Sequence, residues 1–220
     1  MSRTQMVTPD RALTGRASSP FVVPATHAVL GTDLAGPWLT GTEVIHLALG
    51  CFWGAEKGFW QTPGVVTTAA GYQGGYTAYP TYEEVCTGLT GHAETVLVAY
   101  DPQVLPTTEL LAKFWMLHDP TQGYRQGNDV GTQYRSAIYV TTPEQEAAAH
   151  ATREVYAAEL ARHGYGAVTT EIRRAGGEPG TADAGPFYYA EAYHQQYLHK
   201  VPNGYCPVHS TGVACPLPTA

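Results

Sequence analysis

From residue 43 onward the chain alternates short apolar runs with longer stretches of amphipathic spacing. The short runs are rich in β-branched and aromatic residues, which is typical of strands. They occupy residues 43–49, 65–72, 95–100, 135–140 and 167–173. Apolar residues recur with helical spacing over residues 52–61, 108–118 and 143–163. The pattern therefore predicts five strands and three long helices.

Local signals set the ends of these helices. Pro63 stops the first helix, and Asp119 followed by proline closes the second. Residues 142–145 (TPEQ) have the form of a capping box with proline at the first helical position, and Gly164 supplies a C-terminal glycine. The third helix is therefore predicted with both of its boundaries.

The order of the elements is βαβ, then βαβ, then one more helix and strand. This order predicts an α+β fold, a ferredoxin-like split βαβ sandwich with helices on one face of a mixed or antiparallel sheet. Residues 42–200 are expected to form the domain that carries catalysis, with a helix-like stretch at 186–199. Residues 1–41, which mix Pro, Thr and Gly with isolated apolar positions, are expected to be an arm packed on that domain. Residues 201–220 are expected to form a mobile tail.

The charge balance excludes some classes of partner. Twelve Lys and Arg stand against nineteen Asp and Glu, and the net charge of −7 comes with no basic cluster. Nucleic-acid binding depends on clustered basic residues, so no nucleic-acid partner is expected. No apolar stretch approaches the roughly 20 residues of a membrane span, and residues 1–30 lack a secretory pattern. We therefore expect a cytoplasmic protein that does not bind membranes. A monomer is also expected.

Four cysteines, Cys51, Cys86, Cys206 and Cys215, are too few and too scattered for a disulfide framework. Cys206 and Cys215 lie nine positions apart, each followed by proline, in a stretch that lacks regular periodicity. Disulfide formation needs Cα atoms within about 4.4–6.8 Å, so a mobile tail suits a resolving thiol. Zinc binding is the alternative, but no Cys-x-x-Cys pair supports it, and neither a metal nor another cofactor is expected.

Cys51 lies where the first strand ends and the first helix begins. The unpaired N–H groups and the positive end of the helix dipole favour a thiolate there, and such positions lower the cysteine pKa below about 8.5. A buried structural cysteine is the alternative. Phe52 and Trp53 follow directly, and two consecutive helical residues cannot point the same way. One or both of these rings are therefore expected to line a pocket beside the sulfur.

Two further segments hold candidate acids and donors. Glu94 stands at the start of an apolar strand, where desolvation and a nearby thiolate would raise its pKa. A neutral Glu94 could then protonate an oxygen that leaves a substrate, although a solvated strand-end carboxylate is the alternative. The long polar loop at residues 118–136 is typical of functional loops. Asp129 and Tyr134 could place an acceptor and a phenol in a cleft, whereas Arg135 is expected to bind loop carbonyls and carboxylates.

These residues leave several classes of protein open. A cysteine hydrolase would use Cys51 with His118 or His194 as its base, but it would leave the two tail cysteines without a role. A peroxide-reducing thiol enzyme would make no use of the aromatic pocket. A redox-sensing or binding module without enzymatic activity is the third alternative.

Five segments, taken in order, resemble the A-type peptide methionine sulfoxide reductases. They are GCFWGAE at 50–56, GYQGG at 71–75, GHAE at 91–94, the loop at 118–136 and AEAYHQQY at 190–197. They cover most of residues 43–206, and the first segment is highly specific to that family. The tail is similar to that of the bacterial members with two recycling cysteines.

The resemblance implies a role for each candidate residue. Cys51 would attack the sulfur of methionine sulfoxide and become a sulfenic acid as methionine leaves, with Phe52 and Trp53 holding the S-methyl group. The residues implied for binding and protonating the sulfoxide oxygen are Glu94, Tyr82 and Tyr134, with Asp129 ordering the site. Cys86 matches none of these roles and is expected to be a buried thiol.

The resemblance also implies how the enzyme is recycled. Cys206 would attack the sulfenic acid to form a disulfide with Cys51, and Cys215 would exchange in to give Cys206–Cys215. Thioredoxin would then reduce that disulfide. Oxidised proteins and free methionine sulfoxide are the implied substrates, and the family reduces the S epimer, whereas the unrelated B-type enzymes reduce the R epimer.

Overall fold

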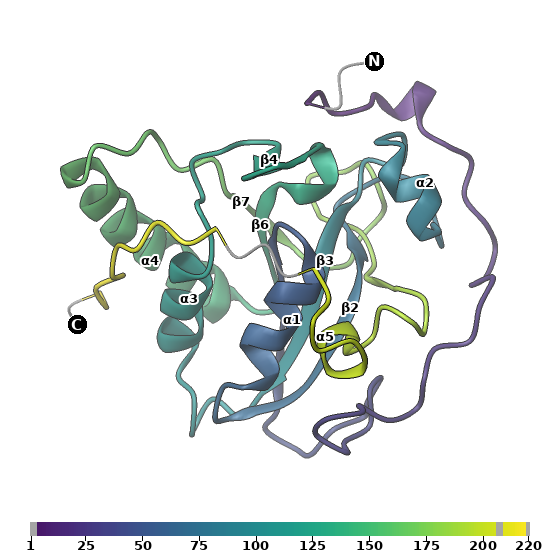
Figure 1. Ribbon diagram of the computed structural model, residues 1–220, viewed down its shortest axis with the longest axis horizontal. Coiled ribbons are helices and arrows are strands. Elements are labelled where there is room, and N and C mark those ends of the chain that lie inside the picture. The colour runs from purple at the N-terminus through teal and green to yellow at the C-terminus, as the bar shows by residue number, and fades with distance from the viewer. Residues whose placement is uncertain (1–3, 206–208, 219–220) are drawn as a thin grey trace.

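A computed structural model describes residues 4–205 and 209–218, and its centre is a six-stranded mixed sheet in the order β7-β6-β1-β3-β2-β8 (Figure 1). The strands of this sheet are β1 (Glu43–Leu49), β2 (Val65–Gln73), β3 (Ala93–Tyr100), β6 (Ser136–Val140), β7 (Glu171–Arg174) and β8 (Tyr188–Tyr189). A separate hairpin consists of β4 (Arg125–Gln126) and β5 (Asp129–Val130). The α-helices are α1 (Phe52–Trp60), α2 (Tyr82–Cys86), α3 (Thr107–Met116), α4 (Pro143–Arg162) and α5 (Tyr197–Lys200). Short 3-10 helices span Pro9–Arg11 and Thr132–Tyr134.

The sheet is built from two interleaved βαβ units. Strand β3 lies between β1 and β2 and is antiparallel to both, so β1 and β2 are parallel and α1 connects them. In the same way β1 lies between β3 and β6, which α3 connects. Strand β7 then adds to β6 in parallel. The predicted α+β class is confirmed, and the sheet is mixed.

Both faces of the two central strands are covered, by different parts of the chain. On β3, Val96 and Val98 face the core beneath α1, α3 and α4, whereas Leu97 and Ala99 face the opposite side. This alternation is the period of two that a strand imposes. Leu34 of the N-terminal segment is fully buried against that second face. Figure 1 shows this segment in purple, running around the outside of the molecule past α2 and β2.

The three long helices and the strands β1, β2, β3 and β6 begin and end within two residues of their predicted bounds. At the N-terminus of α4, Thr142 Oγ1 accepts a hydrogen bond from the Gln145 N–H, which is one half of the predicted capping box. The other half differs, because Gln145 Oε1 accepts from the Thr141 N–H. The last predicted strand is shorter, since β7 begins only at Glu171. Before it, Thr169 is not part of the sheet, because its N–H donates to the Pro120 carbonyl instead.

The helix predicted over residues 186–199 is wrong. Tyr188 and Tyr189 form strand β8 on the edge of β2, paired with Tyr72 and Gly71. This close approach needs glycine, because a Cβ at Gly71 would lie 2.2 Å from the Phe187 ring. Turns follow, and the only helix in this stretch is the four-residue α5.

Helix α2 was not predicted, although the sequence holds its signal. Thr81 Oγ1 accepts from the Glu84 N–H, and the Glu84 carboxylate accepts from the Thr81 N–H. This reciprocal pair is a capping box, written in the chain as Thr-x-x-Glu. It fixes a helix of only five residues.

Residues 209–218 contain no helix or strand and pack against α3 and α4. Val213 is buried, and the Tyr156 phenol of α4 forms hydrogen bonds with Thr211 Oγ1 and the Val213 carbonyl. Ser210 Oγ donates to the Met116 carbonyl at the end of α3. Nothing here tests whether residues 201–220 move, and their mobility stays a prediction.

Candidate active site

Cys51 sits at the junction of β1 and α1, as its N-terminal cap. The preceding Gly50 has φ +97°, and a Cβ there would lie 2.8 Å from the Gln126 side chain. Only glycine tolerates both constraints, so the chain can turn sharply and present the sulfur at the first helical turn. The backbone N–H groups of Trp53 and Gly54 donate to this sulfur, which is nearly buried.

The pKa of Cys51 is raised well above its ordinary value, so the predicted lowering is wrong. Burial is the largest cause, and the negative charges of Glu94 and Asp129 raise the pKa further. The N–H groups of Trp53 and Gly54 act in the predicted direction but are outweighed. Desolvation disfavours the charged thiolate, and here it outweighs the helix N-terminus. In the resting site Cys51 is therefore a thiol.

Glu94 lies on β3, is only 2% exposed, and contacts the start of α1 directly. Its Oε2 accepts a hydrogen bond of 3.0 Å from the Phe52 N–H. Burial, followed by the charge of Asp129, raises the pKa of Glu94 to about 8, which confirms the predicted direction. At neutral pH this carboxyl is protonated, and because Oε2 accepts from an N–H, the proton belongs on Oε1.

Aromatic side chains surround this pair, and the rings of Phe52 and Trp53 lie 6.4 Å apart, both in contact with His194. Phe52 is buried, with ring centroids 4.9 Å from His194 and 6.5 Å from Tyr82. Trp53 is half-buried and stacks on Tyr197 at 4.0 Å. Its Nε1–H donates to His194 Nδ1 at 2.9 Å. Together these rings form an aromatic cluster that directly follows the thiol in the chain.

Two phenols complete the site. Tyr82 begins α2, and its N–H donates to Glu191 Oε1 at 2.8 Å. Burial raises the pKa of both Tyr82 and Tyr134, and the nearby charge of Glu94 raises them further. Both side chains therefore stay protonated and can donate hydrogen bonds. The structure brings the two predicted tyrosines to the same carboxyl.

Asp129 lies on strand β5 at the edge of the site. Its Oδ1 accepts a hydrogen bond of 2.9 Å from the Tyr205 phenol. Among the described residues, its buried Oδ2 has no hydrogen-bond partner. Its charge also raises the pKa of Glu94, and that is how it acts on the reactive pair.

The tail cysteines are only partly placed. Cys206 lies outside the described residues, but Tyr205 on one side of it bonds Asp129, and His209 on the other side packs on Gly127 of the same hairpin region. Cys215 is half-buried at the edge of the core, and burial raises its pKa to about 12.

The described cysteines, Cys51, Cys86 and Cys215, are all thiols. Cys86 was predicted to be buried, but it is only half-buried. It lies at the end of the short helix α2 and interacts with the Tyr82 side chain.

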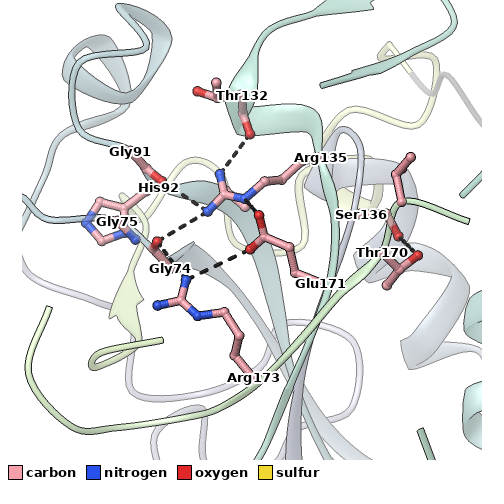
Figure 2. A network of polar contacts seen from close by, with 12 residues as sticks. Gly74, Gly75, Gly91, His92, Thr132, Arg135, Ser136, Thr170, Glu171 and Arg173 are labelled. Atoms are coloured by element: carbon pink, nitrogen blue, oxygen red, sulfur yellow. Dashed lines mark hydrogen bonds and ion pairs between the residues drawn. The ribbon is translucent and has the colours of Figure 1, made fainter. Parts of the chain in front are cut away.

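Arg135 connects the segments that carry the Glu94 carboxyl and the Tyr134 phenol. Its buried guanidinium donates to the carbonyls of Thr132 at 2.9 Å, Gly91 at 3.0 Å and Gly74 at 3.3 Å (Figure 2). Its Nε also lies 3.3 Å from the Glu171 carboxylate. This confirms the prediction that Arg135 serves loop carbonyls and carboxylates.

The structure gives no support to a histidine base. His118 Nδ1 lies 2.9 Å from the Phe114 carbonyl and Nε2 lies 2.7 Å from Ser136 Oγ, so its ring is committed to structural contacts. His194 accepts from Trp53, and burial lowers its pKa to about 3. The charged groups that act on Cys51 are carboxylates.

Sequence reasoning missed three residues that hold this pocket together, His194, Tyr197 and Glu191. All three lie in the AEAYHQQY segment, from which the sequence suggested only His194, and only as the base of a hydrolase. In residues 4–205 and 209–218, no three His, Cys, Asp or Glu side chains cluster as a metal site would require. Of the helices in the described part of the chain, none is both long and apolar enough to cross a membrane.

Comparisons with known proteins agree with this geometry. The family model of peptide methionine sulfoxide reductase matches residues 43–215. The peptide methionine sulfoxide reductase MsrA of Rhodospirillum centenum is 60% identical over 217 residues, which cover 99% of this chain and 94% of that protein. The protein of the same name from Pseudomonas aeruginosa is 55% identical, with 97% and 95% covered.

Solved structures show the same likeness. Methionine sulfoxide reductase A of Corynebacterium diphtheriae superposes with a TM-score of 0.83 at 51% identity, covering 98% of this chain and all of that chain. Mxr1 of Saccharomyces cerevisiae in reduced form has a TM-score of 0.67 at 33% identity, with 79% and 94% covered. The fold and site are those of a thiol-dependent oxidoreductase. The chain belongs to the peptide methionine sulfoxide reductase family, in its MsrA branch.

Proposed function

We propose that this enzyme reduces methionine S-sulfoxide, free or within oxidised proteins, through a sulfenic acid on Cys51. The observation that carries the proposal is the contact between the buried carboxyl of Glu94 and the first turn of α1, which places a protonated acid beside the thiol. Reduction of a sulfoxide needs a nucleophile for sulfur and a proton for oxygen, and this pair supplies both.

In the first step the Cys51 sulfur attacks the sulfoxide sulfur while Glu94 protonates the oxygen. Tyr82 and Tyr134 donate hydrogen bonds to that oxygen, because their raised pKa values keep both phenols protonated. The thiol proton restores Glu94, the oxygen passes to Cys51 as a sulfenic acid, and methionine leaves.

Recognition of the methyl group is the role of the aromatic cluster. Phe52 and Trp53 bind the S-methyl group by apolar contact. Trp53 is fixed for this by two contacts, the hydrogen bond to His194 and the stacking on Tyr197. Asp129 orders the opposite edge of the site through its contact with Tyr205.

Recycling proceeds through the tail. The Cys206 thiol attacks the sulfenic acid, which forms the Cys51–Cys206 disulfide and releases water. The Cys215 thiol then attacks this disulfide, which frees Cys51 and leaves Cys206–Cys215. A thioredoxin dithiol reduces that last disulfide, so one sulfoxide is reduced for each thioredoxin oxidised. Repair of oxidised proteins in the cytoplasm by a monomeric enzyme is the setting we infer.

The proposal is tested by turnover with separated S and R epimers of a methionine sulfoxide peptide, with dithiothreitol as reductant. We expect the S epimer to be reduced and the R epimer to be left unchanged. Hydrogen peroxide and an ester serve as the substrates of the rival enzyme classes. Faster turnover of either rival substrate, or equal turnover of both epimers, would overturn the assignment.

A further inference from the structure

The N-terminal arm contains a tight turn at residues 25–34 that is organised by a fully buried histidine. His27 Nδ1 accepts hydrogen bonds from the N–H groups of Val29 and Leu30, both at 3.1 Å. Backbone N–H groups can only donate, so this nitrogen is unprotonated and Nε2 carries the hydrogen. Nε2 therefore donates to Thr68 Oγ1 on β2, at 2.9 Å.

The same polar chain continues to a carboxyl on the helix of the nucleophile. Because Thr68 Oγ1 accepts from His27, its own hydrogen is available to Glu56 Oε1 at 3.2 Å. Glu56 is fully buried on α1 and also accepts from Gln196, from its N–H at 2.8 Å and its side-chain amide at 2.7 Å. Gln196 Oε1 in turn accepts from the Ala28 N–H of the arm, which closes a circuit.

Gln196 stands in the segment that holds Trp53. Its backbone is in the left-handed region, at φ +48°. A residue other than glycine keeps that conformation only where its surroundings over-determine it, and here the contacts with Glu56 and Ala28 do so. Two residues before Gln196, His194 accepts a hydrogen bond from Trp53. One residue after Gln196, Tyr197 stacks on the Trp53 ring.

The arm lies outside the part of the chain that defines the family. The family model begins at residue 43, after the turn at 25–34 has ended. The arm therefore reaches the substrate pocket from outside the residues that the family model matches. Its connection is a set of buried and half-buried hydrogen bonds.

We propose that the turn at residues 25–34 is a positioning element of the substrate pocket, which acts through His27, Thr68, Glu56 and Gln196 to hold Trp53. The inference rests on the proposed role of Trp53 in binding the S-methyl group. Among the described residues, the hydrogen bonds of Glu94 and of the Cys51 sulfur go to the first turn of α1 and not to the circuit. Loss of the circuit therefore weakens substrate binding and leaves the chemical step intact.

The test compares two routes from the same turn to the sheet. Thr68→Val keeps the shape of the side chain and interrupts the circuit, and His27→Leu interrupts it one step earlier. Thr32→Val is the matched control, because Thr32 Oγ1 donates to the Val66 carbonyl at 2.9 Å, a hydrogen bond that leads away from the pocket.

We expect KM for a methionine S-sulfoxide peptide to rise about 2- to 30-fold in both circuit variants, the range for residues coupled through packed networks. The first-turnover rate at saturating sulfoxide should stay within about twofold of wild type, and Thr32→Val should match wild type in both. Should His27→Leu fail to fold, Thr68→Val decides alone. Wild-type KM in the folded circuit variants, or an equal rise in Thr32→Val, would overturn the proposal.

A double-mutant cycle shows whether the effect passes through Trp53. Trp53→Phe lacks the Nε1–H that bonds His194, so adding Thr68→Val to it should change KM little further. An undiminished effect in that background would place the action of the arm elsewhere and contradict the inference. If wild type itself does not reduce methyl sulfoxides, the proposed function fails. If wild type reduces methyl sulfoxides and the circuit variants keep the wild-type KM, the inference alone fails.

Discussion

The pocket around Cys51 and the tail that carries Cys215 place their thiols in opposite ways. Cys51 and Glu94 are fixed by adjacent strands of the sheet and by a hydrogen bond to the first turn of α1. Residues 209–218 have no regular structure and are held by side-chain contacts such as Tyr156 with Thr211. Chemistry at a single atom pair needs fixed geometry, whereas disulfide exchange needs a thiol that can be brought to another. In the function proposed above, reduction and recycling therefore belong to two separate kinds of structure in this chain.

The largest effect is expected when the fixed thiol of Cys51 is removed. Cys51→Ser should reduce turnover to the uncatalysed rate with either thioredoxin or dithiothreitol, because an alcohol is a poor nucleophile at neutral pH. Methionine release from a sulfoxide peptide measures this directly. Substantial residual turnover would remove Cys51 from its role.

Replacing the acid tests the other half of the pocket. Glu94→Gln should lower the first-turnover rate by roughly 10²–10⁴-fold, the usual contribution of a general acid. In wild type the protonated form is the active one, so with a pKa of about 8 the rate should fall as pH rises through that value. In the variant this fall should vanish.

The measurement is the loss of the Cys51 thiol in rapid-mixing experiments from pH 6 to 9. Peptide affinity serves as the control, since the substitution preserves the shape of the side chain. An unchanged rate and pH profile would mean that Glu94 is a structural carboxyl only.

The tail variant should affect recycling and spare the chemistry. Cys215→Ser should complete a full first turnover and then stop or slow sharply when thioredoxin is the only reductant. Dithiothreitol, which is small enough to reach a shielded disulfide, should restore much of the cycling. Cys86→Ser is the matched control and should cycle normally with both reductants. A diminished first turnover in Cys215→Ser would show that the two regions are not separate.

The smallest expected effect lies in the pocket wall. Trp53→Ala should raise KM for methyl sulfoxides roughly tenfold, as expected for lost apolar contact with a small group, and should leave the Cys51 thiol titratable. The ratio of methyl to bulkier sulfoxide turnover should fall. If the ratio matches wild type, the methyl group is bound elsewhere.

The local sequence pattern was enough to predict the helices and strands whose buried positions recur at regular intervals along the chain. Strand β3 alternates its residues between two covered faces, and Thr142 and Gly164 mark the ends of α4, so these elements followed from neighbouring residues alone. The capping box of Thr81 and Glu84 carried the same kind of signal and was overlooked.

Other features depend on partners far along the chain. The left-handed Gln196, which breaks the predicted helix, is held by Glu56 at a separation of 140 residues. The pKa of Cys51 is raised, although the sequence predicted a lowering. The helix terminus can be read from neighbouring residues, whereas burial depends on the whole fold. The motif supplied the candidate residues, but their protonation states depend on the folded surroundings.

The division between a fixed reaction site and a recycling tail is tested most directly by a peptide map of oxidised enzyme. Wild type is mixed with excess methionine S-sulfoxide peptide without reductant, and the remaining thiols are then alkylated and the disulfides assigned. The account predicts a Cys206–Cys215 disulfide, with Cys86 alkylated and at least one equivalent of methionine released. Finding Cys51 bridged to Cys86, or both tail cysteines still alkylated as thiols after turnover, would contradict it.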